Sequence, residues 1–232
     1  MHASALANGE LFFKTYLGAD GAGRSVVEIG SQDVNGSLRS VCPPGVEYIG
    51  VDFTAGKGVD VVLDDPYELP FDDASVDCCV SSSVFEHSEM FWVLFLEVLR
   101  VLRPEGLFYL NAPSNGLFHR YPVDCWRFYP DSGAALAEWG RRNGYRCRLL
   151  ESFIGRQARE PWNDFVAVFV KDEAHRSAYP DRILARHRDF YNGITDASDE
   201  VLNPERRSQD ELFRAPTRAA RRILESLRSR PR

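Results

Sequence analysis

The amino-acid sequence predicts an α/β protein built on a seven-stranded, mostly parallel sheet, with helices on both faces and an antiparallel last strand. Short apolar runs recur through the first 170 residues, and several are continuous, as expected for parallel strands that are covered on both faces. The first two runs are joined across a glycine-bearing turn, and the second ends in an acid, as in a nucleotide-binding sheet. The last two runs are separated by a loop with no long helix, so they can pair antiparallel.

The elements follow from these runs in chain order. The expected strands are residues 25–29, 48–51, 59–63, 76–81, 107–111, 147–153 and 165–170. A helix over residues 3–17 places its apolar side chains mostly on one side and is expected to pack over the ligand site or the sheet edge. A second helix, residues 88–102, has Ser88 as its cap and ends before Pro104 and Gly106. A third, residues 131–142, is closed by Asn143 and Gly144.

The turn after the first strand indicates which ligand the sheet binds. Gly30 ends this strand, and Asp52 ends the second strand, where an acid can bind ribose hydroxyls. A dinucleotide site needs three closely spaced glycines, whereas here Gly36 is the only other glycine in the turn. Glu28 and Asp33 place carboxylates where a pyrophosphate would sit, so the site repels phosphate and suits a cation. S-adenosylmethionine (SAM) fits, because it has a ribose, an ammonium group and a sulfonium but no phosphate.

Composition narrows the function classes. The chain has 232 residues, 44% hydrophobic and 27% charged, as is usual for a soluble globular protein. Its net charge of -6 gives no reason to expect nucleic-acid binding. The five cysteines form no C-x-x-C pair and predict reduced thiols in a cytoplasmic protein rather than a zinc site. No apolar run reaches about 18 residues, so no membrane span is expected, and no secretion signal is recognisable.

The domain organisation is expected to have three parts. Residues 1–170 form the main domain, and the polar residues 171–213 form an extension that serves as a lid or a homodimer contact. Residues 214–232 carry seven arginines and one acid, which predicts a basic helix or a disordered tail. Binding of nucleic acid or an anionic membrane is the alternative for this tail.

Five segments, in order, resemble the class I SAM-dependent methyltransferases with a methyltransferase-11 type core. They cover roughly residues 25–170: Glu28-Ile29-Gly30, Gly50-Val51-Asp52, residues 65–73 with Leu-Pro-Phe, residues 76–87 with Glu86-His87, and residues 99–106. The resemblance implies a Rossmann-like fold, SAM as cofactor and S-adenosylhomocysteine as product. Residues 119–128 are also similar to a subgroup associated with bacterial polysaccharide or secondary-metabolite pathways.

The resemblance also implies cofactor-binding residues. Gly30, Ser31 and Gln32 border the methionine part of SAM, and Glu28 holds its ammonium group or bonds to loop amides. Asp33 contacts the ammonium group or caps the next helix.

The second and fourth strands supply the remaining cofactor contacts. Asp52 accepts both ribose hydroxyls, and Phe53 stacks on the adenine or lies in the core. Asp65 is favoured over Asp64 as the acceptor of the adenine amino group. Pro66 has no N–H, so the ring contact is either lost or supplied by another residue such as Tyr67. Ser82 and Ser83 border the sulfonium.

Methyl transfer depends mostly on positioning, but a hydroxyl acceptor must also lose a proton. His119 is the first candidate for the base, with Asp124 orienting it or acting as base itself, and His87 is the next candidate or braces its turn. The walls of the acceptor pocket are expected from Tyr121, Trp126, Arg127 and Tyr129, unless Trp126 anchors the loop to the core. His119, Asp124, Glu86 and His87 can bind a divalent metal if their loops meet, although their spacing does not demand it.

The sequence therefore predicts a SAM-dependent O-methyltransferase that acts on a sugar, a glycan or a glycosylated metabolite. An N- or C-methyltransferase of a small metabolite is one alternative. A non-catalytic, methyltransferase-like scaffold is the other.

Overall fold

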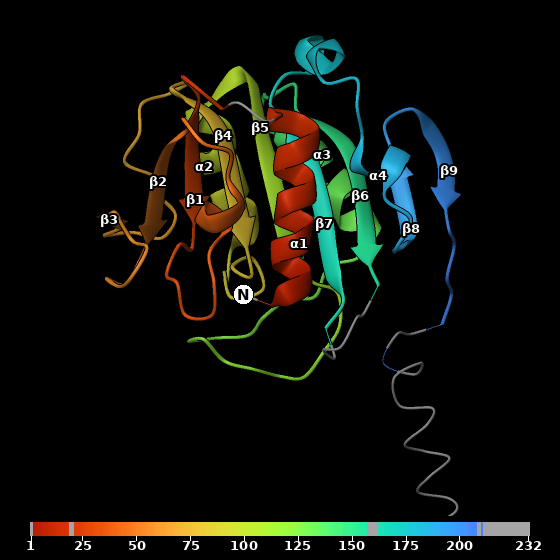
Figure 1. Ribbon diagram of the computed structural model, residues 1–232, viewed down its shortest axis with the longest axis horizontal. Helices are drawn as coiled ribbons and strands as arrows, with labels where there is room; N and C mark the ends of the chain where they lie inside the picture. The colour runs from red at the N-terminus through yellow and green to blue at the C-terminus, as the bar shows by residue number, and fades with distance from the viewer. Residues whose placement is uncertain (1, 19–20, 157–161, 208–209, 211–232) are drawn as a thin grey trace, which may run out of the picture.

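The computed structural model describes residues 2–18, 21–156, 162–207 and 210, which form a nine-stranded sheet with helices on both faces (Figure 1). The strand order is β3-β2-β1-β4-β5-β7-β6-β8-β9. The strands are β1 Ser25–Ile29, β2 Glu47–Asp52, β3 Val61–Val62, β4 Val76–Ser82, β5 Leu102–Pro113, β6 Arg148–Gly155, β7 Asp164–Val170, β8 Phe190–Thr195 and β9 Ser198–Leu202. The main helices are α1 Ala3–Phe12, α2 Phe91–Val101, α3 Pro130–Arg142 and the single turn α4 Ile183–Arg186.

The predicted fold class is confirmed. Strands β3, β2, β1, β4 and β5 are parallel to one another, and β7 is antiparallel to both β5 and β6. The sheet is two strands wider than expected, because β8 pairs with β6 and β9 pairs with β8. Within residues 171–213, the predicted extension, β8 and β9 continue the sheet beyond β6, and the role of a lid or dimer contact stays a prediction. The arginine-rich residues 214–232 lie outside the described residues.

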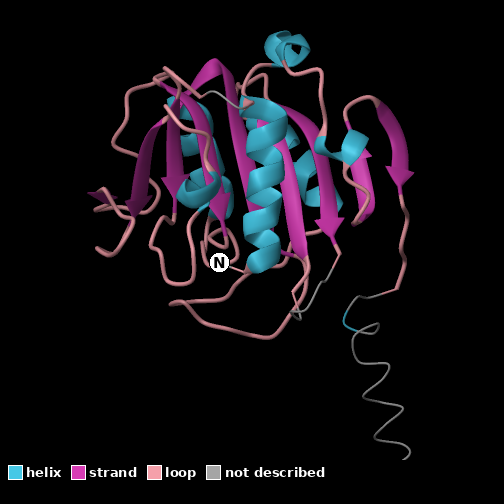
Figure 2. Cartoon of the chain, in the orientation of Figure 1, coloured by secondary structure: helices cyan, strands magenta, loops and turns pink. Residues whose placement is uncertain are grey.

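Two helices cover one face of the sheet, and the N-terminal helix covers the other (Figure 2). On the first face, α2 and α3 bury Leu94, Phe95 and Leu136 against the sheet. On the second, α1 and the π-helical segment Phe13–Leu17 pack on β5 and β7, with Phe12 against Tyr109 at a ring-centroid distance of 4.7 Å. Helix α1 therefore lies over the middle of the sheet rather than at its edge (Figure 1).

The expected helix over residues 88–102 is shorter at its start. Ser88 does not cap it, because residues 84–88 form a turn in which the amides of His87 and Ser88 bond the Val84 carbonyl at 2.8 and 3.1 Å. Helix α2 begins at Phe91 after a Met90 cap. Helix α3 agrees with its prediction to within one residue and is followed by Gly144 at φ +90°. None of the helices in the described residues is long and apolar enough to cross a membrane.

The side chain of Asp77 links the paired strands β1 and β4 at their starts. Its Oδ2 accepts the Ser25 amide at 2.8 Å and the Ser25 hydroxyl at 3.0 Å, and its Oδ1 is paired with the Arg103 guanidinium. Burial alone would raise the pKa of Asp77, but these partners hold that pKa below its usual value. The carboxylate therefore ties the starts of two central strands together.

We predict that Asp77→Asn lowers the free energy of unfolding by about 1 to 2 kcal/mol at pH 7, because one charged acceptor is lost. Because the folded-state pKa is depressed, this contribution is present above the unfolded pKa of about 3.9 and is lost as the pH falls through the folded pKa. Urea unfolding between pH 3 and 7 measures both effects. The exposed Asp72→Asn is the control, and equal losses in the two variants would contradict the anchoring role.

Candidate functional site

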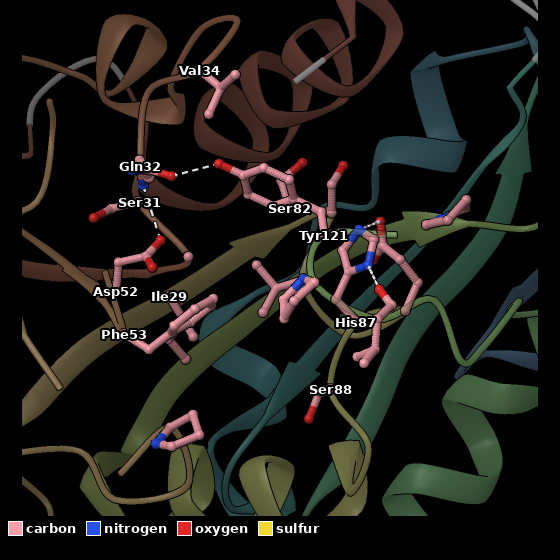
Figure 3. Close-up of a pocket in the computed structure, with 18 of the residues that line it drawn as sticks. Ile29, Ser31, Gln32, Val34, Asp52, Phe53, Ser82, His87, Ser88 and Tyr121 are labelled. Carbon is pink, nitrogen blue, oxygen red and sulfur yellow. Dashed lines mark hydrogen bonds and ion pairs between the residues drawn. The ribbon is translucent and has the colours of Figure 1, made fainter. Parts of the chain in front are cut away.

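A cavity opens where the strand order reverses between β1 and β4 (Figure 3). From β1 the chain crosses to β2 on one side, and from β4 it crosses to β5 on the other, so the two connections diverge from the carboxyl ends of neighbouring strands. Such a crevice is where open α/β sheets bind ligands. The cavity has a volume of about 580 Å³ and is lined by residues that follow β1, β2, β4 and β5.

The turn after β1 requires glycine at position 30. Gly30 has φ +76°, and its amide donates to the Val51 carbonyl at 2.9 Å. A Cβ atom at this position would lie 2.0 Å from Cγ2 of Val84, in the turn after β4. The main chain after β1 is thus pressed against the turn after β4, where only glycine fits.

Asp52 lies at the carboxyl end of β2 and points toward the turn after β1 (Figure 3). Its carboxylate accepts the amides of Gln32 at 3.2 Å and Thr54 at 3.1 Å, and it lines the cavity although its side chain is buried. Phe53 also lines the cavity and is 50% exposed, so its expected alternative role in the core is wrong. Gln32, Ser31, Ser82 and Ser83 all lie in the cavity lining as expected.

Of the two roles considered for Glu28, the structure contains the bonds to the following loop. Its carboxylate accepts the Ser37 hydroxyl at 3.0 Å and the Leu38 amide at 3.3 Å, and so fixes the 3-10 helix Leu38–Val41 that connects β1 to β2. Glu28 also lines the cavity, and burial raises its pKa. Its contact with a ligand ammonium group stays a prediction.

Three acids expected to bind the cofactor lie outside the cavity lining. Asp33 caps its turn by accepting the Gly36 amide at 2.8 Å, and its ion pair with Lys57, at 2.5 Å, lowers its pKa. Asp33 was expected to contact the ammonium group or to cap the next helix. The structure shows a capping bond, but Asp33 caps a turn rather than a helix. Asp64 and Asp65 are exposed.

Asp65 also binds the amide of Tyr67, the residue considered as an alternative donor to the adenine ring. Its Oδ1 accepts the amide of Tyr67 at 2.8 Å, so that amide is already bonded. Pro66 and Tyr67 line the cavity, whereas Asp65 does not. Binding of the adenine amino group by Asp64 or Asp65 stays a prediction that this arrangement does not favour.

Four buried polar atoms in the cavity lining have no hydrogen-bond partner among the described residues. They are Ser31 Oγ, Ser82 Oγ, Glu86 Oε2 and Ser88 Oγ. Buried polar groups are usually satisfied, so atoms of this kind mark a place for a polar ligand or for solvent. The sequence pattern predicts Ser88 as a helix cap and Glu86 only as a ligand of a conditional metal site.

The loops after β4 and β5 bring three titratable side chains together. His87 and His119 both line the cavity, with their ring centroids 4.9 Å apart, and Glu86 Oε1 lies 3.7 Å from His87 Nε2. Burial lowers the pKa of His87 and raises the pKa of Glu86 to about 8. Two of the three residues predicted to be catalytic are thus adjacent at the cavity wall.

The third residue predicted to be catalytic, Asp124, is held away from the cavity. Its carboxylate makes two bonds to Arg127, at 2.5 and 2.9 Å, and accepts the His119 amide at 2.7 Å. Arg127 lowers the pKa of Asp124 to about 2. Because both oxygens are engaged and Asp124 is absent from the lining, this geometry favours the orienting role over the role of base.

Of the four expected wall residues, only Tyr121 lines the cavity, where its hydroxyl donates to Gln32 Oε1 at 2.8 Å (Figure 3). Trp126 instead anchors the loop, because its indole donates to the Ser88 carbonyl at 2.9 Å and its ring packs on Phe91. Arg127 is engaged with Asp124, and Tyr129 is the exposed cap of α3.

Trp162 lines the cavity and was missed from the sequence. Its ring lies between His2, at 5.5 Å, and His119, at 4.8 Å. The residue stands in the connection between β6 and β7, and an isolated aromatic residue in a loop shows no periodicity that would place it at a site.

The fold and the site define a class: a doubly wound α/β protein with a ligand-sized cavity at the reversal of its strand order. Residues 39–110 match a family model described as a methyltransferase domain, so the resemblance stated from the sequence is confirmed for this part of the chain. The solved Burkholderia thailandensis 1,6-didemethyltoxoflavin-N1-methyltransferase, with bound 1,6-didemethyltoxoflavin and S-adenosylhomocysteine, has a similar fold. Its TM-score is 0.55 at 14% sequence identity, with 73% of this chain and 79% of that chain covered.

Curated relatives of this chain are also described as methyltransferases. An uncharacterized methyltransferase of Mycobacterium leprae is 37% identical over 159 residues, which are 60% of this chain and 55% of the relative. One of Mycobacterium avium is 33% identical over 140 residues, 55% of this chain and 54% of the relative. The chain thus spans about half the length of these relatives.

We predict that Gly30→Ala costs about 1 to 3 kcal/mol more stability than Gly23→Ala, because Val84 must move. Gly23 is a matched control, since it has the same φ of +76° but no atom within 4 Å of its added Cβ. Both variants place a side chain at the same positive φ, so their difference in chemical denaturation reports the close approach of Val84. Adding Val84→Ala to Gly30→Ala should recover part of the loss, and equal losses in the two single variants would contradict the packing argument.

Proposed function

We propose that the protein is a SAM-dependent methyltransferase that transfers a methyl group to a hydroxyl of a sugar, a glycan or a glycosylated metabolite. One observation carries the proposal. The buried carboxylate of Asp52, the Gly30 turn and the imidazoles of His87 and His119 line a single cavity at the carboxyl edge of the sheet. A cofactor site and a proton acceptor thus share one space.

The residues of this cavity fit SAM. Asp52 would hold the ribose hydroxyls, and the main chain from Gly30 to Gln32 would border the methionine part, with Glu28 near its ammonium group. The orphaned hydroxyls of Ser31 and Ser82 give a polar ligand two further bonding partners. Phe53 offers an exposed ring beside Asp52 for the adenine. When bound, SAM supplies a methyl group activated by its positively charged sulfur.

The other end of the cavity suits a hydroxyl acceptor. A hydroxyl must lose its proton during the reaction, and an imidazole within reach can accept it. His87 and His119 supply this function from the loops after β4 and β5. Tyr121 and Trp162 give the wall aromatic surface, which packs well against the apolar face of a sugar ring. The fold does not select the methylated atom, since the Burkholderia neighbour is named for transfer to nitrogen.

S-adenosylhomocysteine is expected to bind the chain with one-to-one stoichiometry, and Asp52→Asn should weaken binding at least tenfold because a charged acceptor for the ribose is lost. Isothermal titration calorimetry measures both values. Asp131→Asn, at the exposed start of α3, is the matched control and should bind like the unmodified chain. Absence of binding at millimolar ligand would favour the non-catalytic scaffold and contradict the proposal.

His87→Ala and His119→Ala should each lower turnover by about 100-fold while leaving the affinity for S-adenosylhomocysteine within about threefold, because proton removal and not cofactor binding is impaired. The measurement uses isotopically labelled SAM with a panel of sugars and glycosylated metabolites, and mass spectrometry locates the label.

His175→Ala, outside the cavity, is the control. Label on nitrogen or carbon, or full turnover in both variants, would overturn the hydroxyl assignment without affecting the cofactor assignment.

A further inference from the structure

The side chains of Glu86, His87 and His119 form a compact cluster at the cavity wall. One ligand atom from each residue lies within 4.8 Å of the others. Asp124, the fourth residue considered from the sequence, is excluded because Arg127 and the His119 amide occupy its oxygens. The remaining set contains two imidazoles and one carboxylate.

Both imidazoles are oriented from outside the cluster. His87 Nδ1 lies 2.5 Å from the Val123 carbonyl, and His119 Nδ1 lies 3.2 Å from the Leu117 carbonyl and 3.5 Å from Asp124 Oδ2. A ring nitrogen that faces a carbonyl carries the proton, so the Nε2 atom of each ring is left with its lone pair. Histidines that bind metals are held in this way, with a carbonyl or carboxylate fixing the other nitrogen.

One oxygen of the Glu86 carboxylate lacks the partner that a buried charge needs. The Glu86 side chain is 1% exposed, and Oε2 has no hydrogen-bond partner among the residues that the structure describes. Burying such a group without a partner is costly, and a cation at this position would remove the cost. The main chain at Glu86 is held firmly, because its carbonyl accepts the amides of Cys125 at 2.7 Å and Trp126 at 3.2 Å. These bonds also bring the loop that carries His119 up to the turn that carries His87.

We propose that Glu86, His87 and His119 bind one divalent transition-metal ion of the zinc type. Two imidazoles and one carboxylate are a common ligand set for such ions, and three protein ligands leave coordination positions open. The 3.7 Å between Glu86 Oε1 and His87 Nε2 is close to the separation of about 3.4 Å between ligands of a tetrahedral zinc site. His119, whose side chain is 39% exposed, is the ligand that has room to move closer.

The role of the ion rests on the proposed function. Its open positions would face the cavity, where a hydroxyl that binds a divalent cation loses its proton more easily. With the ion bound, this role would replace the role of base given above: His87 and His119 would hold the ion, and the proton of the hydroxyl would pass to solvent. Metal binding itself does not depend on methyl transfer, so the two proposals fail separately.

The experiment uses the full chain, treated with a chelator and dialysed, with Co²⁺ and Zn²⁺ as the probes. We expect one equivalent of Co²⁺ to bind with visible absorption typical of a four- or five-coordinate site, and Zn²⁺ to displace it. His119→Gln, His87→Ala and Glu86→Gln should each weaken Co²⁺ binding at least tenfold. His175→Ala and His187→Ala, which remove imidazoles outside the cavity, are the matched controls and should bind normally.

His119→Gln is the decisive variant, because its partly exposed side chain can be replaced with little risk to the fold. Circular dichroism and S-adenosylhomocysteine calorimetry on each variant report the fold and the cofactor site independently. Less than one equivalent bound, or His119→Gln binding as tightly as the unmodified chain, would overturn the metal site. Metal binding without S-adenosylhomocysteine binding would leave the metal site standing and overturn the proposed function.

Discussion

The close approach of Gly30 to Val84 is the constraint on which the site depends. With φ +76° at Gly30 and 2.0 Å between its absent Cβ and Cγ2 of Val84, the turn after β1 rests directly on the turn after β4. The two turns begin the connections that leave β1 and β4 in opposite directions, and ligands bind in the crevice between such connections. The carboxylate of Asp52 bonds the Gln32 amide of the first turn, and His87 belongs to the second turn. His119 reaches the same cavity from the loop after β5.

A second layer of contacts fixes the long loop after β5 over the cavity. The loop is secured at three points: Tyr121 bonds Gln32, Trp126 bonds the Ser88 carbonyl, and the Glu86 carbonyl accepts two loop amides. The pair of Asp124 and Arg127 stiffens it internally. Many of the polar residues that suggested chemistry in this loop therefore support its shape, and His119 is the one that reaches the cluster with Glu86 and His87.

The sequence predicted those features that depend on local pattern. Continuous apolar runs located the strands, and the missing helix between β6 and β7 indicated their antiparallel pairing. The positions of Gly30 and Asp52 followed because each ends a strand, and carboxyl ends of parallel strands share one edge of a sheet.

Features that depend on distant contacts were harder to predict. Strands β8 and β9 lie in a polar segment whose pairing with β6 is decided by tertiary contacts, and such context overrides local propensity. Trp126 and Arg127 resembled pocket walls because spacing along a loop does not show which way a side chain points. Asp33 pairs with Lys57, which is 24 positions away in sequence, and no local pattern predicts that ion pair. The importance of Glu86 for the site could not be predicted from the sequence, because the unpartnered state of its Oε2 atom is visible only when its surroundings are known.

A crystal structure of the chain with S-adenosylhomocysteine is the measurement that tests the central claim most directly. The account predicts that both ribose hydroxyls lie within about 3.2 Å of the Asp52 carboxylate. We also expect the homocysteine part of the ligand to pass Gly30 and its sulfur to face the wall formed by Glu86, His87 and His119. A ligand seated elsewhere, or one whose ribose does not reach Asp52, would contradict it.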